Sequence, residues 1–142
     1  MAEQATTPAA PAKGKTYFWG TGRRKTAVAR VRICAGNGKF EIDGHEVKKH
    51  FFSEGPQKDC IAPLKATNTL GKWDVFVNVN GGGQTGQSGA ILMGLSRALL
   101  KADPSLEQVL RDGKFMTRDA RKVERKKPGQ PGARKRFQFS KR

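Results

Sequence analysis

Residues 81–86 match the spacing G-x-G-x-x-G that holds the pyrophosphate of a dinucleotide in many enzymes. The match follows a strand-like segment and precedes a helical one, as such a site requires. A dinucleotide fold also needs a second parallel strand ending in an acidic residue about 20 positions later, and here another helical segment follows instead. We therefore expect no dinucleotide cofactor. The glycines and the helix start could still offer backbone N–H groups to an anion such as an RNA phosphate.

Residues 20–26, GTGRRKT, resemble a nucleotide-binding P-loop only superficially. The four-residue gap between the glycines is missing, and the segment leads into a strand pattern instead of a helix. Three adjacent cations, Arg23, Arg24 and Lys25, beside two glycines favour direct contact with RNA phosphates. A solvated turn is the alternative interpretation.

Histidines and cysteines are too few and wrongly spaced for a metal site. His45-Glu46 and His50 exceed the H-E-x-x-H spacing by one residue, so the two imidazoles would point about 140° apart on a helix. Cys34 and Cys60 lack C-x-x-C partners and are expected to be reduced thiols in a cytosol-like compartment. We expect no metal, no cofactor, no small-molecule substrate and no catalytic residues, and hence a protein that is not an enzyme.

Charge is the dominant feature of the sequence. The chain has 142 residues with 28 Lys and Arg against 12 Asp and Glu, a net charge of +16. Such an imbalance indicates a polyanionic partner, either RNA, DNA or an anionic membrane surface, and nucleic acid is favoured. No apolar run approaches the roughly 20 residues of a membrane span, and we expect no membrane association.

More than half of the net charge lies in residues 118–142, which hold 11 basic and two acidic residues. The basic residues are Arg118, Arg121, Lys122, Arg125, Lys126, Lys127, Arg134, Lys135, Arg136, Lys141 and Arg142. This segment has too few apolar residues to fold alone, so we expect an extended tail that is disordered until it binds RNA. Fully extended it spans roughly 80 Å, far beyond the domain itself. Phe137 and Phe139 could stack on unpaired bases or pack on a neighbouring protein.

The segments between residues 16 and 117 must position these cations. A strand pattern begins at Tyr17, is interrupted by residues 20–25, and resumes over 27–33 with Arg30 and Arg32 on its open face. Asn37-Gly38 predicts a two-residue hairpin turn into a return strand over 39–42, and Asp43-Gly44 turns the chain again. Further along, the pattern predicts helices over 46–52 and from Pro56, a strand over 73–79, a long helix over 85–101 and a short helix over 104–110 after an Asp103 N-cap.

We therefore predict three parts: a disordered leader (1–15), an α+β domain with a small sheet backed by helices (16–117), and the extended basic tail (118–142).

Read in order, several stretches of this chain resemble the bacterial type of the small-subunit ribosomal protein numbered nine. They are residues 20–31 (GTGRRKTAVARV), 81–83, 86–90, 94–99, 117–119, 123–127 and the ending 137–142 (FQFSKR). The resemblance extends over residues 17–142.

This resemblance implies a domain like the second domain of small-subunit ribosomal protein five, and a cytoplasmic structural protein of the small ribosomal subunit. It implies binding to 16S ribosomal RNA in the subunit head beside neighbouring head proteins. It also implies a tail that reaches the anticodon stem-loop of peptidyl-site tRNA through Ser140, Lys141 and Arg142. The expected rRNA contacts are Arg23, Arg24, Lys25, Arg30, Arg32, Arg118, Arg121, Lys122, Arg125, Lys126, Lys127, Arg134, Lys135 and Arg136. The alternative is a histone-like protein that compacts nucleic acid.

Overall fold

The computed structural model describes residues 14–141, so the predicted leader lies outside the described residues except for Gly14 and Lys15, and Arg142 lies outside them too. Five strands form one sheet in the order β1-β2-β5-β3-β4. The strands are β1 (Phe18–Arg24), β2 (Ala27–Ala35), β3 (Phe40–Ile42), β4 (His45–Glu46) and β5 (Trp73–Asn80). The helices are α1 (Val47–His50), α2 (Glu54–Ala66), α3 (Gln84–Ala102), the 3-10 turn η1 (Pro104–Leu106) and α4 (Glu107–Asp112).

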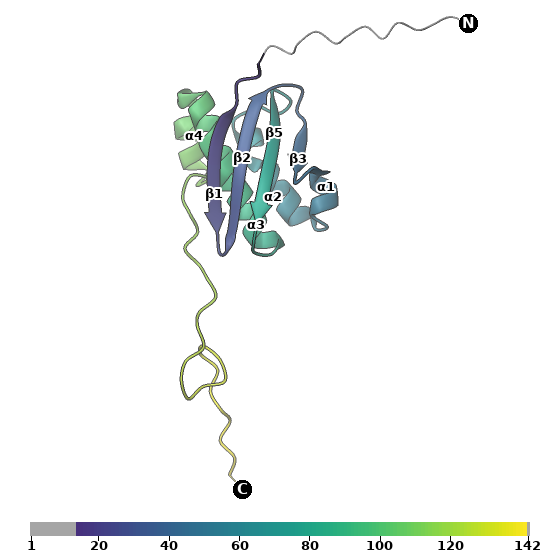
Figure 1. Ribbon diagram of the computed structural model, residues 1–142. Coiled ribbons are helices and arrows are strands. Elements are labelled where there is room, and N and C mark those ends of the chain that lie inside the picture. The colour runs from purple at the N-terminus through teal and green to yellow at the C-terminus, as the bar shows by residue number, and fades with distance from the viewer. Residues whose placement is uncertain (1–13, 142) are drawn as a thin grey trace, which may run out of the picture.

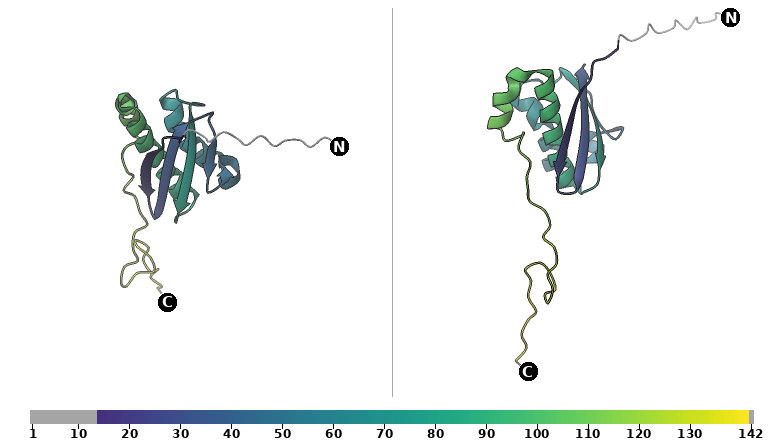
Figure 2. Two further views of the ribbon diagram at one scale, coloured as in Figure 1. Left: turned by 45° about the horizontal axis from the view of Figure 1, so that its top comes forward. Right: turned by 60° about the vertical axis from the view of Figure 1, so that its left-hand side comes forward.

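Among residues 14–141, helices cover one face of the sheet and leave the other open. Helices α2, α3 and α4 lie behind it in Figure 1, and the side view in Figure 2 shows the sheet and the helices as two layers. Strands β1, β2 and β5 pair antiparallel, β3 runs parallel to β5, and β4 returns antiparallel to β3. The predicted α+β architecture, a small sheet backed by helices, is confirmed.

The core lies between the sheet and α3. Alternate residues of β2, such as Ala29 and Val31, are buried, and so are Val75 and Val77 of β5. Helix α3 covers them with an apolar side that includes Ile91, Leu95, Ala98 and Leu99, all fully buried. Arg30 and Arg32 fall on the opposite face of β2, as the alternation predicts.

The predicted interruption of the first strand at residues 20–25 is wrong. Strand β1 continues to Arg24, and only Lys25 and Thr26 form the turn into β2. The glycines serve packing: a Cβ on Gly20 would lie 2.1 Å from the carbonyl oxygen of Gly94, and a Cβ on Gly22 would lie 1.8 Å from that of Ala90. Helix α3 therefore approaches β1 more closely than any side chain allows. The two glycines face the helix, and contact between this segment and RNA phosphate stays a prediction.

The predicted hairpin at Asn37-Gly38 is wrong as well. A turn does occur there, with Gly38 at φ +94°, but β5 inserts between β2 and β3, so β3 does not pair with β2. The Asp74 carboxylate of β5 holds this loop by accepting hydrogen bonds from the backbone N–H groups of Asn37 (2.8 Å), Gly38 (3.1 Å) and Lys39 (3.0 Å). A long-range carboxylate thus replaces the local hairpin pairing.

The remaining predicted elements are found within a few residues. Asp43 and Gly44 form the turn between β3 and β4, and the side chain of Asp103 accepts a hydrogen bond from the backbone N–H of Ser105 at the start of η1. Residues 118–141 contain neither helix nor strand, and Figure 1 shows this segment leaving the domain and running away from it.

Candidate nucleic-acid interface

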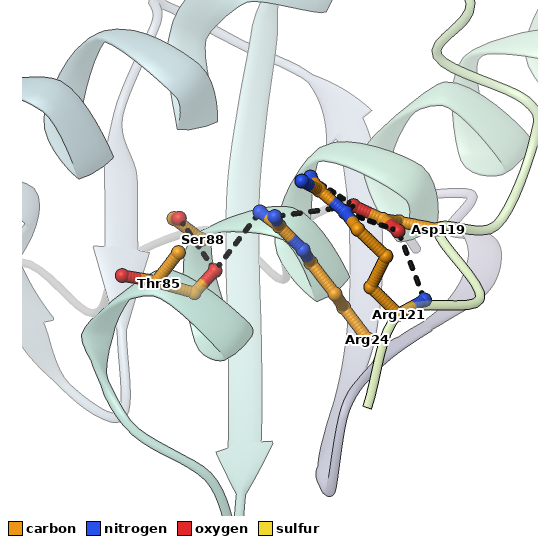
Figure 3. A network of polar contacts seen from close by, with 5 residues as sticks. All are labelled: Arg24, Thr85, Ser88, Asp119 and Arg121. Atoms are coloured by element: carbon orange, nitrogen blue, oxygen red, sulfur yellow. Dashed lines mark hydrogen bonds and ion pairs between the residues drawn. The ribbon is translucent and has the colours of Figure 1, made fainter. Parts of the chain in front are cut away.

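The first residues of the tail are fastened to the domain by a cluster of charged side chains. Arg24 at the end of β1 donates from its guanidinium to Asp119 Oδ2 (3.2 Å) and, from its other terminal nitrogen, to the Thr85 carbonyl at the start of α3 (3.4 Å). Arg121 clasps the same carboxylate through its guanidinium (2.7–3.1 Å) and its backbone N–H (3.0 Å). Figure 3 shows this arrangement. We call Arg24, Asp119 and Arg121 the tail anchor.

The charge state of the tail anchor at neutral pH follows from the pKa of Asp119. Hydrogen bonds from the Arg121 side chain, then from its backbone N–H, and the charges of Arg121 and Arg24 hold the pKa of Asp119 well below its ordinary value. The carboxylate therefore stays ionised while two guanidinium groups share it. Because one carboxylate serves two arginines, the cluster keeps a net positive charge.

Helix α3 has a glycine where the Arg24 side chain crosses it. A Cβ at Gly89 would lie 2.2 Å from Cδ of Arg24, so any larger residue would require this side chain to shift. The Arg24 side chain is 20% exposed as a result, in contrast to Arg121 at 81%. The position of the anchor is thus built into the surface of α3.

Other cations surround the anchor in two shallow depressions. The first is lined by Arg23, Lys114 and Arg118, together with Arg24 and the carboxylates of Asp59 and Asp119. The second lies between Lys25 in the β1–β2 turn and Lys122 of the tail, with Arg24 and Arg121 between them. The structure thereby brings together six predicted RNA-binding residues from distant parts of the sequence: Arg23, Arg24, Lys25, Arg118, Arg121 and Lys122.

The middle of the tail closes a small loop on itself. Glu124 pairs with Lys127 and with Nε of Arg134 (2.9 Å), and backbone hydrogen bonds join Lys127 to Gly132 and Gln130 to Lys127. These contacts are solvent-exposed, and such pairs contribute little to stability. A third cationic depression, lined by Lys127, Arg134 and Arg136, lies on this loop.

The acidic residues of the tail are both occupied by ion pairs, and most of its basic residues are not. Within residues 118–141, seven cations have no carboxylate partner: Arg118, Lys122, Arg125, Lys126, Lys135, Arg136 and Lys141. They are all exposed. Their charge is available to an external polyanion such as a phosphate backbone.

A comparison with known proteins gives this surface its context. The family model described as ribosomal protein S9/S16 matches residues 22–142. The chain belongs to the ribosomal protein S9/S16 family. It is 55% identical over 121 residues to the small ribosomal subunit protein uS9 of Anaeromyxobacter sp. (strain K), covering 85% of this chain and 93% of that protein. It is 54% identical to uS9 of Borreliella burgdorferi (strain ZS7), covering 87% and 90%, and 52% identical to uS9 of Thermotoga sp. (strain RQ2), covering 88% and 96%.

Membership of the S9/S16 family confirms the resemblance seen in the sequence and makes the chain a structural ribosomal protein, not an enzyme. Among residues 14–141, no three side chains of His, Cys, Asp and Glu gather as a metal would require. His50 instead contacts the Gln87 side chain (2.9 Å). Burial raises the pKa of Cys60 to about 12, so this thiol is not nucleophilic at neutral pH. Over the same residues, no helix is long and apolar enough to cross a membrane.

The remaining predicted RNA-binding residues of this S9/S16 family member do not join the anchor. Arg30 and Arg32 lie on the open face of the sheet. Arg125, Lys126, Lys127, Arg134, Lys135 and Arg136 lie on and beside the tail loop. Ser140 and Lys141 are exposed near the tip, whereas Arg142 lies outside the described residues. The predicted sites are therefore spread over four parts of the structure: the anchor surface, the open sheet face, the tail loop and the tail tip.

Sequence reasoning missed two parts of the interface of this family member. The sequence shows Asp119 only as one of the two acidic residues of the tail, and its role in holding Arg24 depends on a contact across 95 residues. The aromatic residues on the open sheet face, Trp19 and Phe76, were also missed, although the strand pairing places both beside Arg32. The β1–β2 register together with the β2–β5 pairing would have revealed the second group, and no local signal would have revealed the first.

Proposed function

We propose that this chain is a structural component of the small ribosomal subunit and binds its 16S-type ribosomal RNA through the tail anchor surface and the tail. The observation that carries the proposal is the set of seven exposed tail cations without a carboxylate partner. An isolated protein gains nothing from such unneutralised charge, whereas a phosphate backbone releases counterions on contact. The names of the uS9 relatives support the choice of the small ribosomal subunit as its location.

The anchor gives the tail a defined starting point on the domain. Arg24 fixes Asp119 beside the β1–β2 turn, so the domain and the tail approach RNA as linked sites. Linked sites bind with a raised effective concentration because the second contact is intramolecular. We propose that the domain docks in the subunit head, among other head proteins, while the tail follows RNA away from it.

The tip is proposed to reach the anticodon stem-loop of peptidyl-site tRNA through Ser140, Lys141 and Arg142. Two features support this: the ending FQFSKR resembles the family pattern, and the tail can span roughly 80 Å when extended. Figure 1 shows the tail leaving the domain and running away from it, with a loop in its middle. Two terminal cations suit contact with a tRNA phosphate backbone.

The rRNA proposal is tested by the salt dependence of binding to an rRNA fragment from the subunit head. Changing Arg118, Lys122, Arg125 and Lys126 to Gln should reduce the slope of log affinity against log salt by about 2.8–3.6, because each lost phosphate contact removes about 0.7–0.9. A matched variant changes four exposed lysines of the domain, Lys48, Lys49, Lys65 and Lys101, to Gln.

The matched variant should keep the slope of the unaltered chain. Equal losses in the two variants would show that only total charge matters, which would favour the histone-like alternative. For the tip, deleting Lys141 and Arg142 should leave subunit assembly intact and weaken retention of peptidyl-site tRNA. Unchanged tRNA retention in those particles would remove the decoding-site role and leave the rRNA role standing.

A further inference from the structure

The open face of the sheet carries a cluster of aromatic rings around one arginine. The pairing register places Trp19 of β1, Arg32 of β2 and Phe76 of β5 side by side in one row across three strands. The Arg32 guanidinium lies 5.8 Å from the Trp19 ring centre, 5.4 Å from that of Phe76 and 5.7 Å from that of Tyr17, just before β1. We call Tyr17, Trp19, Arg32 and Phe76 the aromatic platform.

Two of these rings are unusually exposed. Trp19 of β1 is 50% exposed, and Tyr17, which directly precedes β1, is 41% exposed. The helices occupy the other face, so the described part of the chain does not cover the platform (Figures 1 and 2). Two exposed rings next to an arginine on a sheet face that no described helix covers make this face a candidate interaction site.

Charge indicates what the platform binds. Arg32 has no carboxylate partner within residues 14–141, and Arg30 extends the positive surface along the same face. Glu41, the next residue in the row, is neutralised by Lys39 at 2.7 Å. A protein partner would have to bury these cations, which is costly unless it supplies matching carboxylates. RNA supplies phosphates and flat base surfaces together.

The chemistry of the platform suits unpaired nucleotides. Aromatic rings and arginine planes are the groups on which splayed RNA bases stack, and neighbouring strands of a sheet can present them in a row. Beside this row, Thr21, Asn78 and Asn80 provide exposed hydrogen-bonding groups for base edges and sugar hydroxyls. We propose that the open sheet face is a second RNA site, separate from the tail anchor, where unpaired bases stack on Trp19 and Tyr17 beside Arg32. The proposal rests on the proposed function because it requires an RNA partner.

The test compares two single-stranded RNA oligonucleotides of equal length, one with normal bases and one with abasic riboses, so that both present the same phosphates. The full chain should bind the base-containing oligonucleotide more tightly. Trp19→Ala should weaken that binding by about 5- to 150-fold for one stacked base and leave abasic binding unchanged. Trp19→Phe, which keeps a ring, should restore most of the affinity.

Phe52→Ala is the matched control, because Phe52 is 85% exposed and lies between α1 and α2, outside the platform. It should bind both oligonucleotides as the unaltered chain does. Equal binding of the two oligonucleotides by the full chain, or equal weakening of both by Trp19→Ala, would overturn the platform. The two proposals fail separately. If the variant with Arg118, Lys122, Arg125 and Lys126 changed to Gln binds the abasic oligonucleotide with a weaker salt dependence, while Trp19→Ala does not, the proposed function is still supported.

Crosslinking in assembled small subunits distinguishes the partner. Ultraviolet irradiation followed by mass spectrometry should yield nucleotide adducts on peptides that contain Tyr17, Trp19 or Phe76. Crosslinks from these residues to another ribosomal protein, without nucleotide adducts, would overturn the RNA site and assign the face to a protein contact.

Discussion

Substituting Gly22 by alanine tests the closest packing in the domain. The new Cβ would lie 1.8 Å from the carbonyl oxygen of Ala90 and 2.4 Å from the backbone nitrogen of Gly94, whereas real Cβ atoms essentially never come within 3.0 Å of such neighbours. Helix α3 must therefore retreat by more than about 1 Å. Overpacking costs typically about 1–3 kcal/mol, and this case belongs at the upper end or beyond because helix backbone must move, not a flexible side chain. We expect a loss of about 2–4 kcal/mol in the free energy of unfolding.

Urea unfolding of the full chain, followed by tryptophan fluorescence and circular dichroism, measures this loss. Gly55→Ala in α2 is the matched control, because nothing lies within 4 Å of its added Cβ. That change should be neutral or stabilise the chain by up to about 1 kcal/mol, since alanine favours helix over glycine. A Gly22→Ala chain within about 0.5 kcal/mol of the unaltered chain would refute the packing argument. If that chain folded normally but lost RNA affinity, the glycine would belong to an RNA contact after all.

Two carboxylates yield further predictions. Asp74→Ala removes the acceptor for three backbone N–H groups and should cost about 2–3 kcal/mol in urea unfolding. Hydrogen bonds, first from the Lys39 N–H, lower the pKa of Asp74 in the folded chain. Its contribution to the free energy of unfolding should therefore be complete above about pH 4, near its unfolded pKa, and should fade as the pH drops below that value. The Asp74→Ala chain should not show this fading. Asp119→Asn removes the ion pair that holds Arg121, so tryptic cleavage after Arg121 should become faster. Cleavage after Arg136, which does not contact Asp119, should stay unchanged and serves as an internal reference.

The sequence predicts most elements because their signals are local. Alternating residues in β2 and β5, the apolar side of α3 and the Asp103 cap all depend on neighbours within a few positions. Both errors arise where a distant segment decides the outcome. Gly20 and Gly22 read as a turn until α3 is placed against them, and Asn37-Gly38 reads as a hairpin until β5 enters between the two strands.

The same division holds for the interface. Cations can be predicted as RNA ligands from their type and number alone, and these residues stay predictions. Which of them act together could not be predicted. Arg24 and Asp119 meet across 95 positions, and Arg32 is surrounded by rings from two other segments of the chain. Both sets of contacts form only when distant segments pack together, so the local sequence does not predict them.

The anchor explains how a weakly held tail can still act at a defined place. A partly exposed ion pair such as Arg24–Asp119 contributes little to folding because solvent screens it. It does fix the first tail residues against β1 and α3, at one end of the sheet. A flexible chain of about 24 residues has a root-mean-square length of only about 25–30 Å, so in the proposed RNA complex the point of attachment would decide which phosphates the tail meets first. Under that proposal the domain specifies the start of the path, and the tail cations without a carboxylate partner among the described residues supply the affinity along it.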